Sequence, residues 1–257
     1  DLVFTGSDLI VPKNIRNKRL ILVQEGMTNP RNLGFYLVKY LKLPGYIGDT
    51  AATGLSDAYD YFCVASEGYR DFFIGNGVNA DKIKVTGIPN YDNCRKYYDN
   101  DFPYKNFVLA GTSDARETMI YENRKKFIER VTEIASGRQI IYKLHPNEVK
   151  QRAVSEIEKW APKGTLVYTD GNIHEMIANC DVLVTKFSTT VYTGIALGKE
   201  VYSDFDLDQL RELSPIQNRG TSAKSWQRLC SFYTRYYQER FDRKTTKGKR
   251  TKSSTNR

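Results

Sequence analysis

The stretch that decides the fold is residues 140–147, which read IIYKLHPN. A short, mainly apolar run up to Leu144 is typical of a strand buried on both faces of a parallel sheet. His145 and Pro146 end that run, because proline fixes the backbone of a turn, and a helix pattern follows. Ligands of open α/β sheets bind beyond the carboxyl ends of strands, so we predict His145 and Asn147 at a binding edge. His145 can donate to a phosphate or ribose oxygen there; the alternative is a histidine that only caps the strand.

The same alternation of apolar runs and helix-period segments extends in both directions from this stretch. We expect strands at residues 2–5, 20–23, 61–65, 83–86, 107–110, 140–144, 165–168, 182–185 and 200–203. We expect helices at residues 66–75, 117–136, 147–160, 173–179 and 189–197. This rhythm predicts an α/β fold with two Rossmann-like, doubly wound parallel sheets that face a cleft.

A polar, turn-rich segment at residues 94–106 divides the chain into two expected lobes. We expect an acceptor-side lobe over residues 1–100, a nucleotide-donor lobe over 101–225, a terminal helix over 226–241 and a disordered basic tail over 242–257. The first lobe has only four expected strands, and the sequence begins inside an apolar run. These observations predict a first lobe that is incomplete on its N-terminal side.

Three hydroxyl side chains follow the expected strand at residues 182–185. Lys186 comes directly after that strand, and Ser188, Thr189 and Thr190 open the next helix. Hydroxyls and backbone N–H groups at a helix start can hold a phosphate, and Lys186 adds positive charge. The alternative is an ordinary helix cap, which needs only one hydroxyl.

A third loop, at residues 111–117, follows the first expected strand of the second lobe. It carries Ser113 and Arg116, and a guanidinium can pair with a diphosphate as a planar fork. The alternative is a plain turn with a capping residue. His174 lies on the expected helix at 173–179, and two interpretations of it remain: a contact to the base or ribose of a nucleotide, or a position on the protein surface.

Two carboxylates follow strands of the first lobe. Asp8 lies after the strand at residues 2–5, and Glu25 lies directly after the strand at 20–23. A carboxylate there can act as a general base on an acceptor hydroxyl, so both are candidate catalytic residues. For Glu25 the alternative is an exposed residue in a glycine turn.

Composition excludes several classes of protein. Apolar residues make up 40% and charged residues 27%, which is typical of a globular chain without a membrane span. Most of the net charge of +9 lies at residues 240–257, where eight Lys or Arg stand against one acid. A solvated tail and a tether to anionic lipid both fit this segment. No nucleic-acid-binding signature accompanies it, and the four cysteines have no zinc spacing.

Taken in order, these motifs resemble the bacterial UDP-GlcNAc 2-epimerase/GT-B superfamily. That group includes nucleotide-sugar epimerases, sialyltransferase-like enzymes and CDP-glycerol glycerophosphotransferases. The segments that carry the resemblance are residues 1–8 (DLVFTGSD), 23–27 (VQEGM), 62–90, 112–117, 145–147 (HPN), 185–190 (TKFSTT) and 197–199 (LGK). The resemblance covers about residues 1–220 and implies a GT-B-like fold that binds a nucleotide-activated sugar.

Two departures from the epimerase pattern bear on the reaction. The epimerases carry a Glu-Glu pair that grips the ribose, where this chain has Tyr192, Thr193 and Gly194. Their Glu-Glu-x-Asn-Arg segment has no clear counterpart between Met27 and Ser56. The resemblance therefore favours a glycosyltransferase-type transferase of surface polysaccharide assembly. A UDP-GlcNAc 2-epimerase and a non-catalytic nucleotide-sugar-binding protein are the alternatives.

These interpretations also predict partners and location. We expect a nucleotide-sugar (or polyol phosphate) donor and a glycan or lipid-linked acceptor, with no cofactor, no metal and no nucleic acid. We expect a cytoplasmic protein, with contact between the basic tail and the inner face of the membrane as the alternative to a free tail.

Overall fold

The computed structural model describes residues 2–118 and 122–226, and these form two compact units. Of the described residues, the first unit comprises 2–64, 70–89 and 218–226, and the second comprises 65–69, 90–118 and 122–217. Residue 100, near which we expect the boundary between the lobes, lies within the second unit. The expected terminal helix, apart from Trp226, and the basic tail lie outside the described residues.

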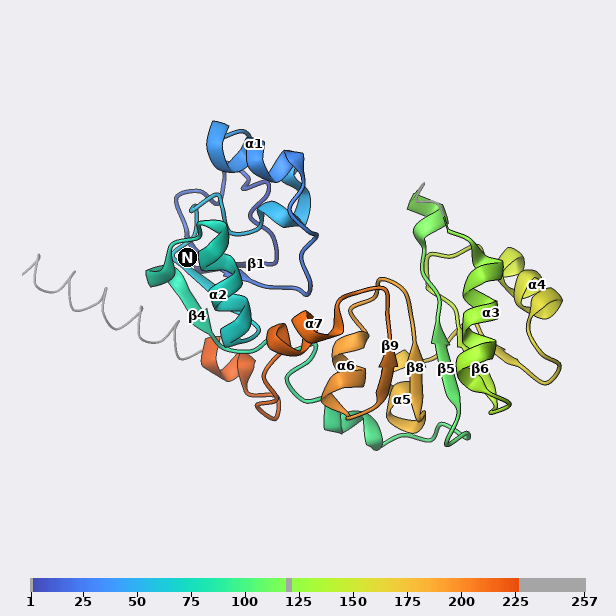
Figure 1. Ribbon diagram of the computed structural model, residues 1–257. Coiled ribbons are helices and arrows are strands. Elements are labelled where there is room, and N and C mark those ends of the chain that lie inside the picture. The colour runs from blue at the N-terminus through green and yellow to red at the C-terminus, as the bar shows by residue number, and fades with distance from the viewer. Residues whose placement is uncertain (1, 119–121, 227–257) are drawn as a thin grey trace, which may run out of the picture. The chain divides into compact units, whose positions relative to one another are not determined.

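The first unit is built on a parallel sheet of four strands (Figure 1). The order is β1 (Leu2–Thr5), β2 (Arg19–Val23), β3 (Tyr61–Val64) and β4 (Ile83–Val85). Its helical segments are α1 (Leu33–Leu41), the 3-10 segment η1 (Gly45–Ala52), α2 (Glu67–Asn76) and the 3-10 turn η2 (Ala80–Lys82). Phe62 of β3 and Phe73 of α2 are both fully buried, with ring centroids 4.6 Å apart, and so join the sheet to α2.

The second unit is a doubly wound parallel sheet of five strands. The strands are β5 (Val108–Gly111), β6 (Ile140–Lys143), β7 (Leu166–Tyr168), β8 (Val182–Val184) and β9 (Glu200–Tyr202), in the spatial order β7-β6-β5-β8-β9. Its helical segments are η3 (Cys94–Tyr98), η4 (Ala115–Thr118), α3 (Arg124–Ala135), α4 (Lys150–Trp160), α5 (Ile173–Asn179), α6 (Val191–Ala196) and α7 (Leu207–Leu213).

Helices cover both faces of this sheet, as Figure 1 shows. Because strand side chains alternate, Val108 and Ala110 pack with α3 and α4, whereas Phe107 and Leu109 pack with α5. Burial on both faces explains why these strands are continuous apolar runs.

The nine expected strands are confirmed, each within one or two residues, and so is the α/β fold class. For the helix expected at 117–136, the predicted start was wrong. Asn123 caps α3 by accepting from the backbone N–H of Lys126 at 3.0 Å, so the regular helix begins at Arg124. Two helices, α1 and α7, were not predicted.

Three of the four cysteines, Cys63, Cys94 and Cys180, lie in the described residues, and each is a buried thiol that forms no disulfide there. Burial raises the pKa of Cys180 to about 12 and also raises the pKa of Cys94, so both stay protonated near neutral pH. Among the helices the structure describes, none combines the length and apolar character needed to cross a membrane.

Candidate functional site

The strand order of the second unit contains a topological switch point. From β5 the chain moves outward to β6 and β7, then returns to the other side of β5 to form β8 and β9. The connections after β5 and β8 therefore leave the sheet in opposite directions, and open α/β sheets bind ligands in the crevice that this creates. The loops after β5, β6 and β8 carry nearly all the predicted nucleotide-binding residues; only His174 lies elsewhere.

A buried network holds the loop after β6 against the loop after β5. The Thr112 hydroxyl accepts from the His145 backbone N–H at 2.9 Å and donates to Glu148 at 2.6 Å. Glu148 pairs in turn with Arg124, which also lies 3.1 Å from Glu122. All three charged side chains are almost fully buried. The backbone at His145 is thus fixed by side chains that are almost completely shielded from solvent.

Arg116 and Ser113 both bond carboxylates of the unit itself. Arg116 makes a two-pronged pair with Glu156 of α4, at 2.9 and 2.6 Å, and this pair raises the arginine pKa. The Ser113 hydroxyl donates to Glu122 at 3.1 Å. A diphosphate at Arg116 would have to displace Glu156, so the observed geometry favours a structural role for this arginine.

His145 and Asn147 lie together at the exposed edge. The Asn147 backbone N–H donates to His145 Nδ1 at 3.3 Å, and its side-chain amide donates to Asp114 at 3.2 Å. His145 Nδ1 also lies 3.6 Å from the Asp114 carboxylate. Asp114, His145 and Asn147 thus form one polar cluster, and the contact between His145 and a phosphate or ribose oxygen stays a prediction.

The loop after β8 gathers hydroxyl groups. Ser188 Oγ lies 2.8 Å from Thr190 Oγ1 and accepts from the Thr190 backbone N–H at 3.3 Å. Thr189 hydrogen-bonds the Tyr91 hydroxyl, and its backbone carbonyl accepts from the Tyr192 N–H at 3.1 Å. These are partly exposed side chains, available in part to a ligand.

Lys186 lines a concave surface of about 290 Å³ beside the same loop. The other residues that line it are Asn123, Lys126, Phe127, Arg130 and Asp204. Arg130 is neutralised by Asp204 at 2.6 Å, so Lys126 and Lys186 give this hollow its positive charge. Its volume is close to the lower end of the range found for pockets that bind small molecules.

His174 is packed inside the second unit. Its Nδ1 lies 2.8 Å from the Thr193 hydroxyl, and its ring stacks on Tyr97 at a centroid distance of 4.8 Å. Burial lowers its pKa, with Lys96 adding to the effect. The side chain therefore holds η3 against α6, a role that neither sequence-based interpretation foresaw.

The two carboxylates of the first unit have different surroundings. Asp8 is buried and accepts from the backbone N–H groups of Gly54 at 2.9 Å and Ser56 at 3.2 Å, which holds that turn in place. Glu25 is exposed, and its carboxylate lies against the bare Cα of Gly6. Of the two, Glu25 has the exposure that a base acting on a substrate needs.

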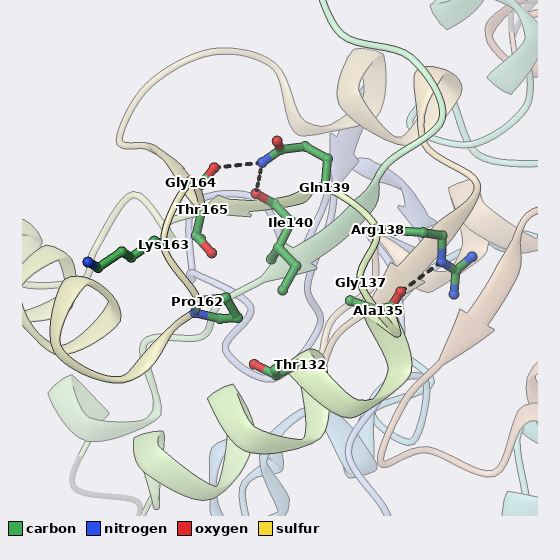
Figure 2. Close-up of a pocket in the computed structure, with 10 residues that line it drawn as sticks. All are labelled: Thr132, Ala135, Gly137, Arg138, Gln139, Ile140, Pro162, Lys163, Gly164 and Thr165. Atoms are coloured by element: carbon green, nitrogen blue, oxygen red, sulfur yellow. Dashed lines mark hydrogen bonds between the residues drawn. The ribbon is translucent and has the colours of Figure 1, made fainter.

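A second hollow, of about 210 Å³, lies at the amino end of β6 (Figure 2). There the Gln139 amide donates to the carbonyls of Ile140 and Gly164, both at 2.9 Å, and Arg138 donates to the Ala135 carbonyl at 3.0 Å. These bonds close the end of α3 and the turn before β7. The hollow lies at the opposite end of the strands from the switch point, so we do not assign it to the same site.

The sequence analysis did not predict the charged residues of the buried network behind His145, which are Glu122, Arg124 and Glu148. The available signal was the acid two residues after Pro146 and the Glu-Asn-Arg run at 122–124. In the part of the chain that the structure describes, no group of three or more His, Cys, Asp or Glu side chains is placed to hold a metal ion.

Comparison with solved structures places this geometry in a known fold. A UDP-GlcNAc 2-epimerase from Neisseria meningitidis bound to UDP-GlcNAc matches with a TM-score of 0.55 at 11% identity, over 82% of this chain and 69% of that one. A putative UDP-N-acetylglucosamine 2-epimerase from Listeria monocytogenes matches with a TM-score of 0.57 at 14% identity, over 88% and 70%. The fold is GT-B-like.

A third structure of this fold is the Methanocaldococcus jannaschii UDP-GlcNAc 2-epimerase in complex with UDP-GlcNAc and UDP. Its TM-score is 0.54 at 12% identity, over 85% of this chain and 78% of that one. No protein-family model and no curated protein matches the sequence. At these identities the likeness establishes the fold of the GT-B-like chain and leaves its reaction to be argued from its own residues.

Proposed function

We propose that the second unit binds a nucleotide-activated sugar through the loops after β5, β6 and β8. The observation that carries this proposal is the strand order β7-β6-β5-β8-β9, which puts hydroxyls, His145 and Lys186 around one switch point. Structures of similar fold hold UDP-GlcNAc or UDP, which supports a nucleotide-sugar ligand. Ser188, Thr189 and Thr190 contact the phosphates in this proposal, and His145 donates to a phosphate or ribose oxygen.

The reaction we favour is transfer of the sugar or polyol phosphate to an acceptor hydroxyl. Glu25 takes the acceptor proton, because it is the exposed carboxylate of the two candidates. Charge that develops on the leaving phosphate is stabilised by preorganised hydroxyl donors and by Lys186. Asp8 has a supporting role, since both of its carboxylate oxygens accept backbone bonds.

Epimerisation of the nucleotide sugar is the second candidate, and the fold likeness to UDP-GlcNAc 2-epimerases favours it. Against it, Tyr192 and Thr193 occupy the region where the epimerase pattern has its ribose-gripping acids, and both are fully buried. Tyr192 donates to or accepts from Tyr69 at 2.7 Å, and Thr193 bonds His174. Because both side chains already bond other residues inside the unit, they stabilise its interior, and neither supplies the carboxylate that the epimerase pattern has in this region.

The binding proposal is tested by thermal shift with UDP, CDP, CMP, GDP and common UDP-sugars. A ligand at a hundredfold excess over its dissociation constant adds about 2.7 kcal/mol of stability. We expect a shift with one nucleotide class that the Ser188→Ala, Thr190→Val double variant reduces. The matched control is Ser225→Ala with Thr221→Val, two residues of the first unit whose hydroxyls donate to backbone carbonyls, those of Thr221 and Asn218. Well-folded protein that shifts with no nucleotide would refute the site.

An assay in deuterated solvent distinguishes transfer from epimerisation. Epimerisation exchanges a proton at the sugar carbon and needs no acceptor, whereas transfer releases the nucleotide product only when an acceptor is present. We expect acceptor-dependent release that Glu25→Gln abolishes and that Glu158→Gln, at an exposed glutamate of α4, does not. Deuterium entering the recovered sugar with no acceptor present would establish epimerisation instead.

A further inference from the structure

Helix α1 has an apolar stripe that faces away from its own unit. Leu33, Tyr36, Leu37, Tyr40 and Leu41 follow the spacing i, i+3, i+4, i+7, i+8, which places them on one side of the helix. In most helices of globular proteins such a stripe faces the core. Here Leu33, Tyr40 and Leu41 are 65% to 76% exposed, and Tyr36 is exposed as well.

The opposite side of α1 makes the packing contacts. Phe35 and Val38 are buried, and Gly34 lies so close to η1 that a side chain there would overlap the Ile47 carbonyl. Helix α1 is therefore fixed to the unit by one apolar side and presents a second one outward. Exposed apolar side chains continue beyond the helix at Leu43 and Tyr46.

The charged residues of α1 and of the turns next to it in the sequence are all basic. Between Glu25 and Asp49 the sequence has Arg31, Lys39 and Lys42 and no acidic residue. The Lys39 ammonium lies 5.7 Å from the centre of the Tyr40 ring, at the margin of the stripe. The rings of Tyr36 and Tyr40 lie nearly parallel, 4° apart, with their centres separated by 6.3 Å.

We propose that this surface, which comprises Leu33, Tyr36, Tyr40, Leu41, Leu43 and Tyr46, docks on an anionic lipid bilayer. Apolar side chains beside Lys and Arg suit a helix lying in the interface, with leucines in the acyl region and cations at the headgroups. Tyrosine has an apolar ring and a polar tip, which is the combination that gathers at membrane interfaces.

Charge complementarity selects this occupant over others. A second copy in a two-fold contact would set the same cations against one another, which disfavours self-association through this surface. The C-terminal segment of the chain is also strongly basic and would be repelled from the surface. An anionic bilayer attracts the cations and accepts the apolar stripe together. This inference does not depend on the nucleotide site.

The test is co-sedimentation of the full chain with vesicles of phosphatidylcholine alone or mixed with equal parts of phosphatidylglycerol. We expect binding to the mixed vesicles that falls by at least about tenfold in Tyr36→Ser with Tyr40→Ser, since two interfacial anchors are lost. The matched control is Tyr98→Ser with Tyr104→Ser, two exposed tyrosines of the second unit, which binds like wild type. Circular dichroism checks that each variant is folded.

Two further variants separate the surface from the basic tail. Lys39→Gln with Lys42→Gln should weaken binding to the mixed vesicles and reduce its dependence on salt. A chain with Gln at Arg243, Lys244, Lys247, Lys249 and Arg250 should retain binding that still depends on Tyr36 and Tyr40. The proposal is overturned if wild type ignores anionic vesicles, or if neutralising the tail alone abolishes binding. It is also overturned if the tyrosine variant binds like wild type, or if its only change is the loss of a dimer in solution.

Discussion

Arg124 and Lys125 are adjacent on α3 but differ in what surrounds them. Arg124 is buried between Glu122 and Glu148, and its Nη1 has no hydrogen-bond partner among the described residues. Lys125 is exposed and 3.7 Å from Glu129, one turn along the helix. A buried charge that loses its partner costs far more than an exposed one, because its desolvation is no longer compensated.

We therefore expect Arg124→Met to lower the free energy of unfolding by about 3–5 kcal/mol. Two carboxylates would be left buried without their cation. Lys125→Met, one residue along, should cost less than about 0.5 kcal/mol. Urea unfolding of the two variants measures both values. Equal small losses would show that the acids are solvated or protonated in the native state.

His174 makes the stability of the second unit sensitive to mild acid. Its pKa is lowered from 6.5 by burial, so the unfolded chain binds this proton more readily than the folded one. The stabilising contribution is complete above pH 6.5 and is lost as the pH falls below that value towards the folded pKa. We expect the melting temperature of wild type to fall between pH 7 and about pH 5 more steeply than that of His174→Asn.

Circular dichroism at pH 7 checks that His174→Asn is folded. A wild-type melting temperature that falls no more steeply than that of His174→Asn would show that His174 binds its proton equally in the folded and the unfolded chain.

A substitution at Gly6 tests the role of Glu25 without altering the charge of the Glu25 carboxylate. A methyl group at Gly6 would overlap the Glu25 carboxylate, which is the end of a flexible side chain and can move aside. Gly6→Ala should therefore change stability by less than about 1 kcal/mol and still reduce turnover, provided Glu25 is the base. Turnover equal to wild type, with Glu25→Gln inactive, would show that the carboxylate acts from another position.

Among the elements, α1 depends on a close backbone approach. A methyl group on Gly34 would meet the Ile47 carbonyl, and the backbone cannot yield as a side chain can. We expect Gly34→Ala to destabilise the protein by about 1–3 kcal/mol, despite the better helix propensity of alanine. Gly75→Ala in α2 is the matched control, because only the end of Arg31 lies near that site, at 3.9 Å. Thermal unfolding that ranks the two variants in the opposite order would contradict the packing of α1 on η1.

The elements that could be predicted from the sequence are those with a strong single pattern. Strands such as β6 and β8 are buried on both faces, so their apolar runs stand out whatever surrounds them. Helix α1 was missed although its apolar residues follow helical spacing, because it is short and lies in a stretch with several turn residues. The start of α3 was misplaced because Asn123 caps the helix, and that depends on a local bond the pattern does not reveal.

The candidate site was predictable in position but not in partners. Sequence order shows which residues follow each strand, and the parallel sheet then brings His145, Ser113 and Ser188 to its carboxyl edge. It does not show that Arg116 is held by Glu156 or that His174 stacks on Tyr97. Those contacts join segments 40 or more residues apart and depend on how helices pack on the sheet.

At the scale of the whole molecule, the first unit is discontinuous in the chain. The sequence leaves it after Pro89 and returns to it at Asn218. On return, the Asn218 amide bonds the Thr86 carbonyl at 2.9 Å, the Trp226 indole donates to the Thr86 hydroxyl at 3.1 Å, and the Trp226 and Phe4 rings lie 6.1 Å apart. Gln217 meanwhile joins the two ends of the second unit through Cys94 and the Tyr91 carbonyl.

This arrangement sets an order of completion during synthesis. Residues 218–226 follow all the residues of the second unit in the chain, so they leave the ribosome after the second unit has done so, and the second unit can close while the first still lacks its last segment. Until then Phe4 and Thr86 have no Trp226 to contact. A nascent chain stalled before residue 218 should expose this side of the first unit to chaperones, and emergence of Trp226 from the ribosome should end that exposure.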